Sequence, residues 1–531
     1  MSRKVILAWA CCCLGLVVAA QGEVIRVPGD YPTIQAGIDA AQNGDTVLVA
    51  DGVYTGDGNR DLDFGGKLIS VVSENGPEDC IIDCEGSEND PHRGFYFHSG
   101  ETSDAVLAGF TIKNGYVTED SPGGGHGGAI LCDSSHPTIK SCTFRENWAS
   151  RGGGILCESS SPTIKNCTFR ENWAGYDGSG MCNVRSSPTV INCAFSGNST
   201  EYNGGGMTNY DDSNPTVINC TFSGNSAGGG GGMSNYVSNP TLTDCAFTQN
   251  TASVGAGMWN HGERPTLTNC TFSGNVATET GGGMYNFNSG PVVTNCAFRE
   301  NEAYEGGGMY NRYSCATVRN CVFRENTTGE RGGGIYCDHS TLTITNCTIT
   351  RNGADGNGGG VCCCNRSTPT ITNCSITENT AEIYGGGIYC NRSTPTITNC
   401  TIRRNSATNG RAVACDSSQQ QYPSEVEIAN SILWDGGDEI WNNDGSTIRI
   451  IFSDVEGGWP GRRNIDADPL FVGGPLGDYY LSQRGCGQPE DSPCIDAGKG
   501  RANKLGLRKY TTCTEGKKDK KRVDMGFHYP R

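Results

Sequence analysis

The chain has 531 residues, including 77 glycines and 29 cysteines, with 35% hydrophobic residues and a formal net charge of -17 at pH 7. This charge excludes nucleic acid and anionic membrane surfaces as principal partners, because both would repel the chain. Neutral glycans or cations are better partners for a chain of this charge. The glycine content argues against a large helical core.

The first segment, 1–22, has the features of a secretory signal peptide. Arg3 and Lys4 precede an apolar run over 5–18, and small residues follow at 19–20. No later run approaches the roughly 18 apolar residues that a membrane-spanning helix requires. We therefore predict an exported monomer, secreted or held at the cell surface, with no membrane span in the mature chain.

The next segment, 23–122, is predicted to form an N-terminal cap and irregular first coils. Within 33–42, Ile34, Ile38 and Ala41 fall on one helical face, and an Asn-Gly pair follows. A stack of β-coils leaves an open apolar end, so a short helix here is expected to cover it. The strand after it, TVLVA, is predicted to begin the first coil.

One stretch of this segment resembles part of a metal-binding loop. The sequence DGNRDLD at 57–63 imitates the start of a calcium-binding loop, although Leu62 replaces the required glycine and Leu68 the bidentate glutamate. These departures argue against a calcium site, so no cofactor is assigned from the sequence, and Ca²⁺ at this loop is kept only as an alternative.

The long central segment, 123–432, repeats one unit. Each unit contains a marker cysteine, and successive markers are 25 to 27 residues apart. Phe or Ile stands two residues after each marker, and Asn stands five residues after it. The markers are Cys142, Cys167, Cys193, Cys220, Cys245, Cys270, Cys296, Cys321, Cys347, Cys374 and Cys400.

The unit predicts a β-coil. Apolar residues at a spacing of two, separated by Gly, Asn and Pro, indicate short strands joined by sharp turns. The Asn before most markers, such as Asn346 and Asn399, suits a left-handed turn. Each unit then completes one coil, stacked at roughly the 4.8 Å strand spacing. The predicted fold is all-β, a right-handed parallel β-helix of about 12 or more coils.

The leucine-rich repeat is the competing solenoid. Ile397, Cys400, Ile402 and Asn405 fit its frame. Leucine is scarce in the repeats, however, and the other half of each coil reads GGGIYC or similar, which is too rich in glycine for a helix. The β-helix is therefore favoured.

The cysteines need a separate explanation. Of the 29, three lie in the signal segment at 11–13, which leaves 26 in an exported protein. Stacked markers with parallel Cβ directions do not favour disulfides. We predict buried thiols that fill a narrow core, with a metal-binding line of sulfurs as the alternative. The run CCC at 362–364 is a candidate for a reactive thiol.

Two further columns follow the glycines. The first is predicted to be a buried amide ladder: Asn183, Asn209, Asn235, Asn260, Asn286 and Asn311. The second points outward, and it is the predicted glycan strip: Trp259, Tyr285, Tyr310, Tyr336 and Tyr389. Tyr236, His261 and Phe287 are among the neighbours two residues further on. Rings in register could stack on sugar faces, or could stabilise the sheet across strands.

The last segment, 433–531, loses the repeat and is predicted to hold one or two irregular coils and a loop-rich cap. A disulfide could form among Cys486, Cys494 and Cys513. Four aspartates could coordinate a cation or cap turns, namely Asp466, Asp468, Asp496 and Asp524.

Several motifs carry a family resemblance. GGAI at 127–130 and the F-x-x-N cores at 144–147 and 169–172 resemble the repeats of chlamydial polymorphic outer-membrane proteins. The whole chain more closely resembles secreted bacterial right-handed β-helix proteins of the pectate-lyase-like superfamily. Their usual opening matches 31–54, and their usual ending matches DADPLF, SPCIDAG and VDMGFHY. The resemblance implies the fold but leaves the activity open, since that superfamily includes lyases, hydrolases and adhesins.

Two functions stay open. The first is a structural or adhesive, non-catalytic protein that binds a polysaccharide or cell-surface glycan along the strip. The alternative is a polysaccharide lyase or glycoside hydrolase with its site in the irregular coils, among Asp435, Asp438 and Glu439. A lyase needs a base and a cationic partner, and a hydrolase needs paired carboxylates across a groove. Neither set is recognisable in the sequence, so no catalytic residue or metal ligand is assigned.

Overall fold

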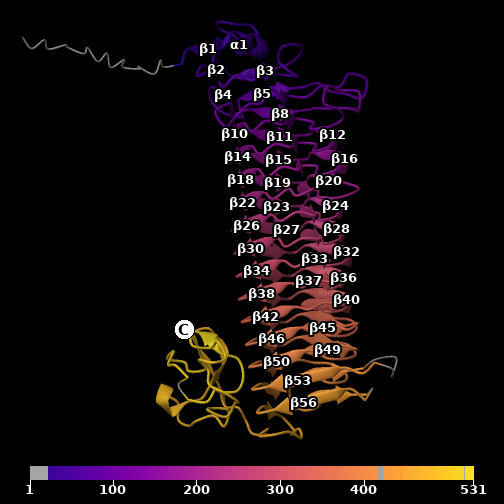
Figure 1. The fold of residues 1–531 in the computed structure, drawn as a ribbon, viewed down its shortest axis with the longest axis vertical. Helices are drawn as coiled ribbons and strands as arrows, with labels where there is room; N and C mark the ends of the chain where they lie inside the picture. The colour runs from indigo at the N-terminus through magenta and orange to yellow at the C-terminus, as the bar shows by residue number, and fades with distance from the viewer. Residues whose placement is uncertain (1–21, 417–421, 444, 520) are drawn as a thin grey trace, which may run out of the picture.

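The computed structural model describes residues 22–416, 422–443, 445–519 and 521–531. The chain winds into an elongated parallel β-solenoid of about 16 turns (Figure 1). The predicted signal peptide falls almost wholly outside the described residues, as do the cysteines at 11–13. In the described part of the chain, no helix is long and apolar enough to cross a membrane.

Each regular coil contributes one strand to each of four parallel sheets, which we name A, B, D and C in chain order. In the first regular coil they are β10 (Thr138–Lys140), β11 (Thr143–Arg145), β12 (Trp148–Arg151) and β13 (Ile155–Glu158). Successive coils align residue for residue, so that Phe144 pairs with Phe169. The predicted parallel β-helix is confirmed.

Sheet C carries the predicted glycan strip and has 14 strands. They are β6 (Phe95–Phe97), β9 (Ile130–Asp133), β13 (Ile155–Glu158), β17 (Met181–Val184), β21 (Met207–Tyr210), β25 (Met233–Tyr236), β29 (Met258–His261), β33 (Met284–Phe287), β37 (Met309–Arg312), β41 (Ile335–Asp338), β45 (Val361–Cys364), β49 (Ile388–Asn391), β52 (Val413–Cys415) and β55 (Ile440–Asn442).

The core consists of stacked columns. In sheet B, buried phenylalanines lie ring on ring with centroids 4.4 to 4.9 Å apart: Phe144, Phe169, Phe195, Phe222, Phe247, Phe272, Phe298 and Phe323. The marker cysteines beside them are buried and free, as predicted. The left-handed turns before the markers are also confirmed, with φ of 56° at Asn346 and 55° at Asn399.

Two buried asparagine ladders run along the axis. In the predicted ladder, each Nδ2 from Asn183 to Asn286 donates to the next Oδ1 at 2.7 to 2.9 Å. The Asn five residues after each marker forms a second ladder, from Asn147 to Asn405, with equivalent distances of 2.8 to 3.0 Å. In the second ladder the amides also bond to backbone groups, as Asn172 does to the carbonyl oxygen of Phe144 at 3.0 Å and to the amide of Asn147 at 3.2 Å. In the first ladder Asn183 Oδ1, at its start, has no partner among the described residues.

The triple glycines allow the coils to stack at the corner between sheets D and C. Gly152 has φ of +66°, and a Cβ atom on Gly154 would lie 2.4 Å from the carbonyl oxygen of Gly180. A side chain at either position would strain the turn or separate the coils, which explains the repeated GGG.

The N-terminal cap contains the predicted helix. The helix α1 (Ile34–Ala40) begins after Thr33, whose hydroxyl accepts from the amide of Ala36, and it buries Ile34 and Ile38. One detail of the prediction is wrong, because the first coil begins before the helix. The alternating strand β1 (Val24–Val27) already pairs with β2 (Thr46–Val49) in sheet A.

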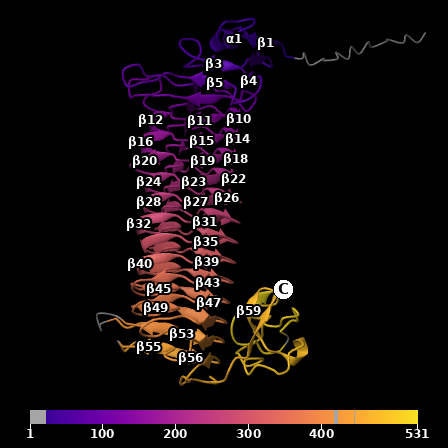
Figure 2. The same cartoon turned by 180° about the vertical axis from the view of Figure 1, so that it is seen from behind.

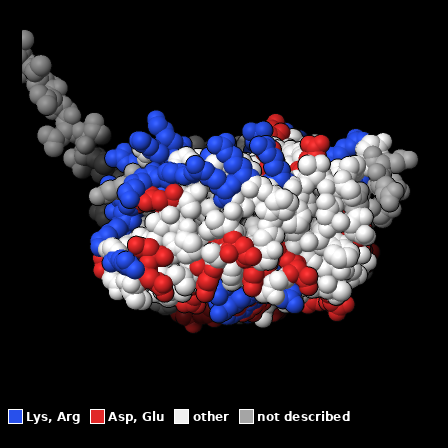
Figure 3. Space-filling model, turned by 90° about the horizontal axis from the view of Figure 1, so that it is seen from below, with Lys and Arg blue, Asp and Glu red and all other residues white. Residues whose placement is uncertain are grey.

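The last coil is closed by a loop. After β56 (Thr447–Ile451) and β57 (Asp454–Val455), Trp459 packs against the end of the main core. Viewed from this end, uncharged side chains occupy much of the surface, and Lys and Arg gather along one edge (Figure 3).

The rest of the C-terminal segment lies beside the solenoid and not over its end (Figures 1 and 2). It is loop-rich, as predicted, with a hairpin of β58 (Phe471–Gly474) and β59 (Gly477–Leu481). The disulfide joins Cys486 to Cys513, while Cys494 is free and buried. We call residues 467–531 the side cap.

Candidate functional site: the aromatic wall of sheet C

The five residues of the predicted strip occupy the second position of sheet C strands. They face away from the core and stand in register, with Cys362 between Tyr336 and Tyr389. The prediction that these five side chains are exposed is wrong. Tyr310, Tyr336 and Tyr389 are 6%, 3% and 4% exposed, and Trp259 and Tyr285 are half-buried.

The physical reason is that residues at the end of sheet D pack against these rings. Sheet D continues beyond its regular strands to the residues that precede each GGG, where Arg331, Asn357 and Tyr384 pair from coil to coil. Tyr384 packs against the cluster that contains Tyr310, and its ring lies 6.1 Å from that of Tyr389. Burial raises the pKa of Tyr310, Tyr336 and Tyr389, so these phenols stay neutral.

The more accessible rings stand further along each coil, two residues after the second strand position in four coils and three residues after it at Tyr313 and His339. Each ring contacts the next in a tilted or T-shaped arrangement, and we call the set the outer aromatic column: Tyr210, Tyr236, His261, Phe287, Tyr313 and His339. Successive ring centroids are 5.9, 4.6, 5.1, 6.1 and 5.0 Å apart. Tyr236 is 37% exposed and Tyr313 is 47% exposed, so the column presents ring surface to solvent.

Two residues of the predicted strip widen this column. The ring of Trp259 lies 6.0 Å from that of His261, and the ring of Tyr285 lies 6.4 Å from that of Phe287. Burial lowers the pKa of His261, so its imidazole is neutral near pH 7. The result is an apolar, largely uncharged platform two rings wide at these coils.

A charged pair lies at one end of the platform. The Arg312 guanidinium carbon is 5.5 Å from the centroid of Tyr313, and Arg312 Nε is 3.4 Å from Asp338 Oδ2. Aromatic faces beside planar hydrogen-bonding groups suit a sugar ring, which has both C–H faces and hydroxyl edges.

The acidic residues proposed for a hydrolase do not form an accessible pair. Asp435 and Glu439 are 8% and 4% exposed, whereas Asp438 is exposed. Burial raises the pKa of Asp435 to about 7 and that of Glu439 to about 9. Asp435 extends the second asparagine ladder, because its Oδ1 accepts from the Asn405 amide at 2.6 Å. These carboxyls belong to the core and do not flank a groove.

A cavity of about 400 Å³ in the irregular first coils holds a set of residues that sequence reasoning missed. Asp63 Oδ2 lies 3.3 Å from His98 Nε2, and Asp61 pairs with His92 Nδ1. The ring of His98 lies 4.1 Å from that of Tyr96. These residues come from two different coils, so no spacing in the sequence indicates their proximity.

Arg93 supplies the cationic group of this cavity. It is 2% exposed, and its Nη2 donates to the carbonyl oxygens of Pro122 at 2.6 Å and Gly124 at 3.2 Å. Its Nη1 has no hydrogen-bond partner among the described residues. Burial lowers the pKa of Arg93 to about 10, so the guanidinium remains charged at neutral pH.

The same cavity uses two aspartates of the calcium-like sequence. Asp61 Oδ1 accepts from the Arg93 amide at 2.9 Å, and Asp63 Oδ1 accepts from Gly65 at 2.8 Å. The remaining acid, Asp57, has a side chain that is 99% exposed. Asp61 and Asp63 contact different imidazoles, those of His92 and His98. The structure does not test whether calcium binds at this loop.

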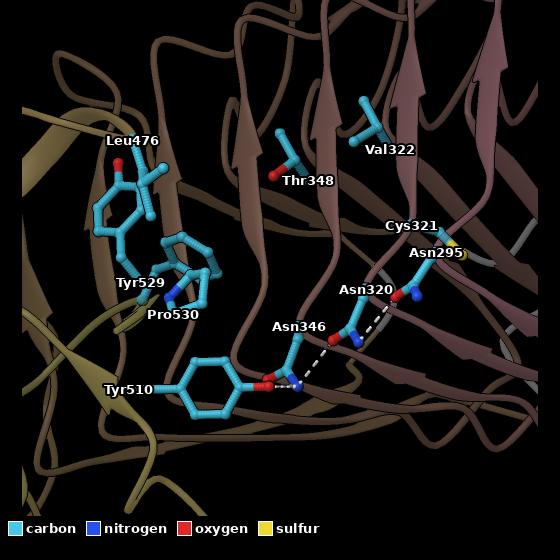
Figure 4. A pocket seen from close by; sticks show the side chains of 11 residues that line it. Asn295, Asn320, Cys321, Val322, Asn346, Thr348, Leu476, Tyr510, Tyr529 and Pro530 are labelled. Atoms are coloured by element: carbon cyan, nitrogen blue, oxygen red, sulfur yellow. Dashed lines mark hydrogen bonds between the residues drawn. The ribbon is translucent and has the colours of Figure 1, made fainter. Parts of the chain in front are cut away.

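A second cleft of about 420 Å³ separates sheet B from the side cap (Figure 4). Asn346 Nδ2 donates to Asn320 Oδ1 at 3.2 Å and also contacts the Tyr510 hydroxyl. Leu476 and Tyr529 line the opposite wall. The described lining includes no carboxylate and no imidazole, and the cleft lies between two parts of the chain.

The fold and the aromatic wall together define a parallel β-solenoid with an aromatic face along sheet C. The chain belongs to the right-handed β-helix family, whose model, "Right handed beta helix region", matches residues 49–222, 99–272, 181–356 and 328–455. This match confirms the predicted handedness. No curated protein matches the chain.

Solved structures share the fold at low identity. Tailspike protein 3 of bacteriophage CBA120 is 11% identical with a TM-score of 0.36, over 82% of this chain and 62% of the tailspike. The catalytic unit of a GH87 α-1,3-glucanase from Streptomyces thermodiastaticus is 11% identical with a TM-score of 0.35, covering 81% and 72%. PfbA, a surface adhesin of Streptococcus pneumoniae, is 11% identical with a TM-score of 0.30, covering 87% and 97%. This chain therefore spans less than two thirds of the tailspike.

Proposed function

We propose that the protein is an exported, non-catalytic β-helix that binds a polysaccharide or cell-surface glycan along the outer aromatic column. The observation that supports this proposal is the unbroken row of six rings in contact on six successive coils. At the spacing of parallel strands the row is about 24 Å long, which matches a chain of several sugars.

The solenoid also suits such a role mechanically. Its coils are joined by backbone ladders and by amide ladders, so the rings are held in fixed register before any ligand arrives. Binding to a preorganised surface costs little conformational entropy. The buried rings Tyr310, Tyr336 and Tyr389 pack beside the column and do not contact the sugar in this proposal.

A glycan array followed by isothermal titration with the best ligand tests the proposal. The double variant Tyr236→Ala plus Tyr313→Ala removes the two exposed tyrosine rings of the column and should weaken binding about tenfold or more. The matched control is Tyr176→Ala plus Tyr202→Ala. These residues form an exposed ring pair on another face, 51% and 52% exposed with centroids 5.4 Å apart. Equal loss in both variants, or in neither, would contradict the proposal.

The N-terminal cavity supports a second candidate function, a polysaccharide lyase. Two carboxylate–imidazole pairs could accept a proton from a sugar carbon, and the free Nη1 of Arg93 could bind the carboxylate of an acidic sugar. This candidate differs from the first because it requires turnover and an acidic substrate.

The lyase candidate is tested by incubating the protein with acidic polysaccharides and following the ultraviolet absorbance of the new double bond. His98→Ala and Arg93→Lys should abolish any turnover, while Tyr236→Ala plus Tyr313→Ala should leave it intact. Absence of turnover on a substrate that binds would favour the non-catalytic proposal.

A further inference from the structure

We propose that the side cap contains a binding site for one divalent transition-metal ion of the Zn²⁺ type. Its ligands are one carboxylate oxygen each from Asp519 and Asp524 and the Nε2 atom of His528. These three ligand atoms all lie within 4.8 Å of one another.

The site is buried. The Asp519 side chain is 3% exposed, Asp524 is 4% exposed and His528 is fully buried. Two ionised carboxylates in so dry an environment are costly unless a proton or a cation compensates them. Lys521 does not supply it, because its side chain is 80% exposed and its Nζ lies 3.3 Å from Asp496 Oδ2. Arg522 instead donates to the carbonyl oxygen of Gly498 at 2.6 Å.

His528 gives independent evidence for a ligand. Its Nδ1 lies 3.0 Å from the carbonyl oxygen of Gly526 and must donate to it, so a neutral ring carries its lone pair on Nε2. That Nε2 atom is buried and has no hydrogen-bond partner. It faces Asp519 Oδ2 at 3.7 Å, which is too far for a hydrogen bond.

The same distance suits a shared metal ion. Two ligands held about 2.1 Å from a tetrahedral centre lie roughly 3.4 Å apart, close to the separation of His528 Nε2 and Asp519 Oδ2. One imidazole with two carboxylates is a donor set that fits Zn²⁺ better than Ca²⁺ or Mg²⁺, which prefer oxygen ligands alone. Water would complete the coordination.

The groups around the ligands are arranged as in known metal sites. The backbone carbonyl that accepts from Nδ1 orients the imidazole. The amide of Asp496 donates to Asp524 Oδ1 at 2.7 Å, and the Thr512 hydroxyl donates to Asp524 Oδ2. Each oxygen keeps a further lone pair for a metal.

A metal here would fasten the side cap to the solenoid. His528 also makes two backbone hydrogen bonds to Asn373, with its amide donating to Oδ1 at 2.7 Å and its carbonyl accepting from Nδ2 at 2.9 Å. The ion would therefore link the chain end that docks on the coil to the loop that carries Asp519 and Asp524.

Titration of ZnCl₂ into the chelator-treated full chain tests the site. Cys315, the exposed free cysteine among the described residues, is alkylated first so that its thiol cannot bind the metal. We expect one Zn²⁺ per chain, which CaCl₂ or MgCl₂ in excess should not displace. Substituted Co²⁺ should give a visible spectrum without the thiolate charge-transfer band that cysteine ligands produce.

Variants locate the ion. Asp519→Asn and His528→Gln should weaken Zn²⁺ binding about 100-fold or more, whereas Asp478→Asn, an exposed acid of the same cap, should not change it. If His528→Gln fails to fold, Asp519→Asn and the Co²⁺ spectrum of the unmodified sequence still decide the question. Binding that is absent from the unmodified sequence, or that survives Asp519→Asn, would overturn the proposal.

Discussion

Asp435 is the residue at which the second asparagine ladder ends, and its chemistry differs from that of the amides before it. Its Oδ1 accepts from the Asn405 backbone amide, as every asparagine of the ladder accepts from its predecessor. Glu439 Oε1 in turn accepts from the amide of Asp435 at 2.7 Å. Asp435 and Glu439 thus place two buried carboxyls close together, whereas an asparagine at position 435 would carry no charge.

We predict that Asp435→Asn stabilises the protein at pH 8. The pKa of Asp435 is raised from 3.8 to about 7 and that of Glu439 from 4.5 to about 9, mainly by burial. The folded state therefore binds more protons than the unfolded state between about pH 4 and pH 9, and the free energy of unfolding falls as the pH rises. The variant should gain on the order of 2 kcal/mol at pH 8.

Denaturant unfolding at pH 8 and pH 4.5 measures this effect. The gain from Asp435→Asn should shrink strongly at pH 4.5, where Asp435 of the unmodified protein is protonated in the fold. Asp438→Asn is the matched control, because Asp438 is exposed. If both variants have the same free energy of unfolding at pH 8, the ionised Asp435 carboxyl does not destabilise the folded protein.

The thiols of the run CCC should be unreactive in the folded protein. Cys362, Cys363 and Cys364 are 0%, 0% and 2% exposed, and the pKa of Cys362 is raised well above its usual value by burial. Thiol alkylation requires an accessible thiolate. A short alkylation followed by mass spectrometry should label Cys315 and leave the run unmodified until denaturant is added. Labelling of Cys362 at the rate of Cys315 would contradict the burial of this run.

At the level of the elements, each strand is too short to be stable alone, and the amide ladders contribute to holding the coils together. Asn275 accepts from both the backbone amide and the Nδ2 of Asn250, and it donates to Phe247 and to Asn301. Removing it leaves buried donors and acceptors without partners on both neighbouring coils.

Asn275→Ala should therefore destabilise the central coils by about 3 kcal/mol or more, since each orphaned buried group costs about 1–3 kcal/mol. Thr251→Ala, at an exposed strand position of a nearby coil, should change stability by less than about 0.5 kcal/mol. Because solenoids open locally, hydrogen exchange of the coils around Asn275 is the appropriate measurement. Similar exchange in both variants would remove the energetic role assigned to the ladder.

The repeated elements could be predicted from the sequence because their signal is local and occurs in every coil. The marker cysteines, the Asn five residues later and the left-handed Asn turns each follow from one unit stacked on the next. Exposure of Tyr310 and Tyr336 could not be predicted in this way. Alternation places a side chain outside the core, but whether a neighbouring sheet covers it depends on the length of the sheet D strands.

The irregular ends were less predictable for a related reason. His98 and Asp63 meet because two unequal coils place them side by side, and no period relates them.

At the scale of the whole molecule, the side cap reaches back over the column of Asn residues at the corner between sheets A and B. Asn373 and Asn399 are buried under it, whereas Asn219, at the same position of an earlier coil, is exposed.

In the part of the chain that the structure describes, the contacts of Asn373 with the side cap have no counterpart at Asn219. Asn373 makes two hydrogen bonds to the backbone of His528, in addition to its Nδ2 bond to Asn346 at 2.9 Å. Asn219 makes the equivalent ladder bond to Asn192 at 2.9 Å and lies on a coil that the cap does not reach. Both residues have φ of 51°, so alanine meets the same backbone strain at either position.

Asn373→Ala should speed hydrogen exchange and limited proteolysis in the side cap, while the early coils keep their protection. Asn219→Ala should leave the cap unchanged, because it removes the ladder bond and adds the strain without touching the interface. The backbone amide and carbonyl of His528 lose their partners in the first variant, a cost of about 2 kcal/mol or more that falls on docking alone. If the cap exchanges equally fast in both variants, the Asn373 contacts do not hold it, and its attachment depends on the remaining contacts of Tyr510 and Phe527 with the solenoid.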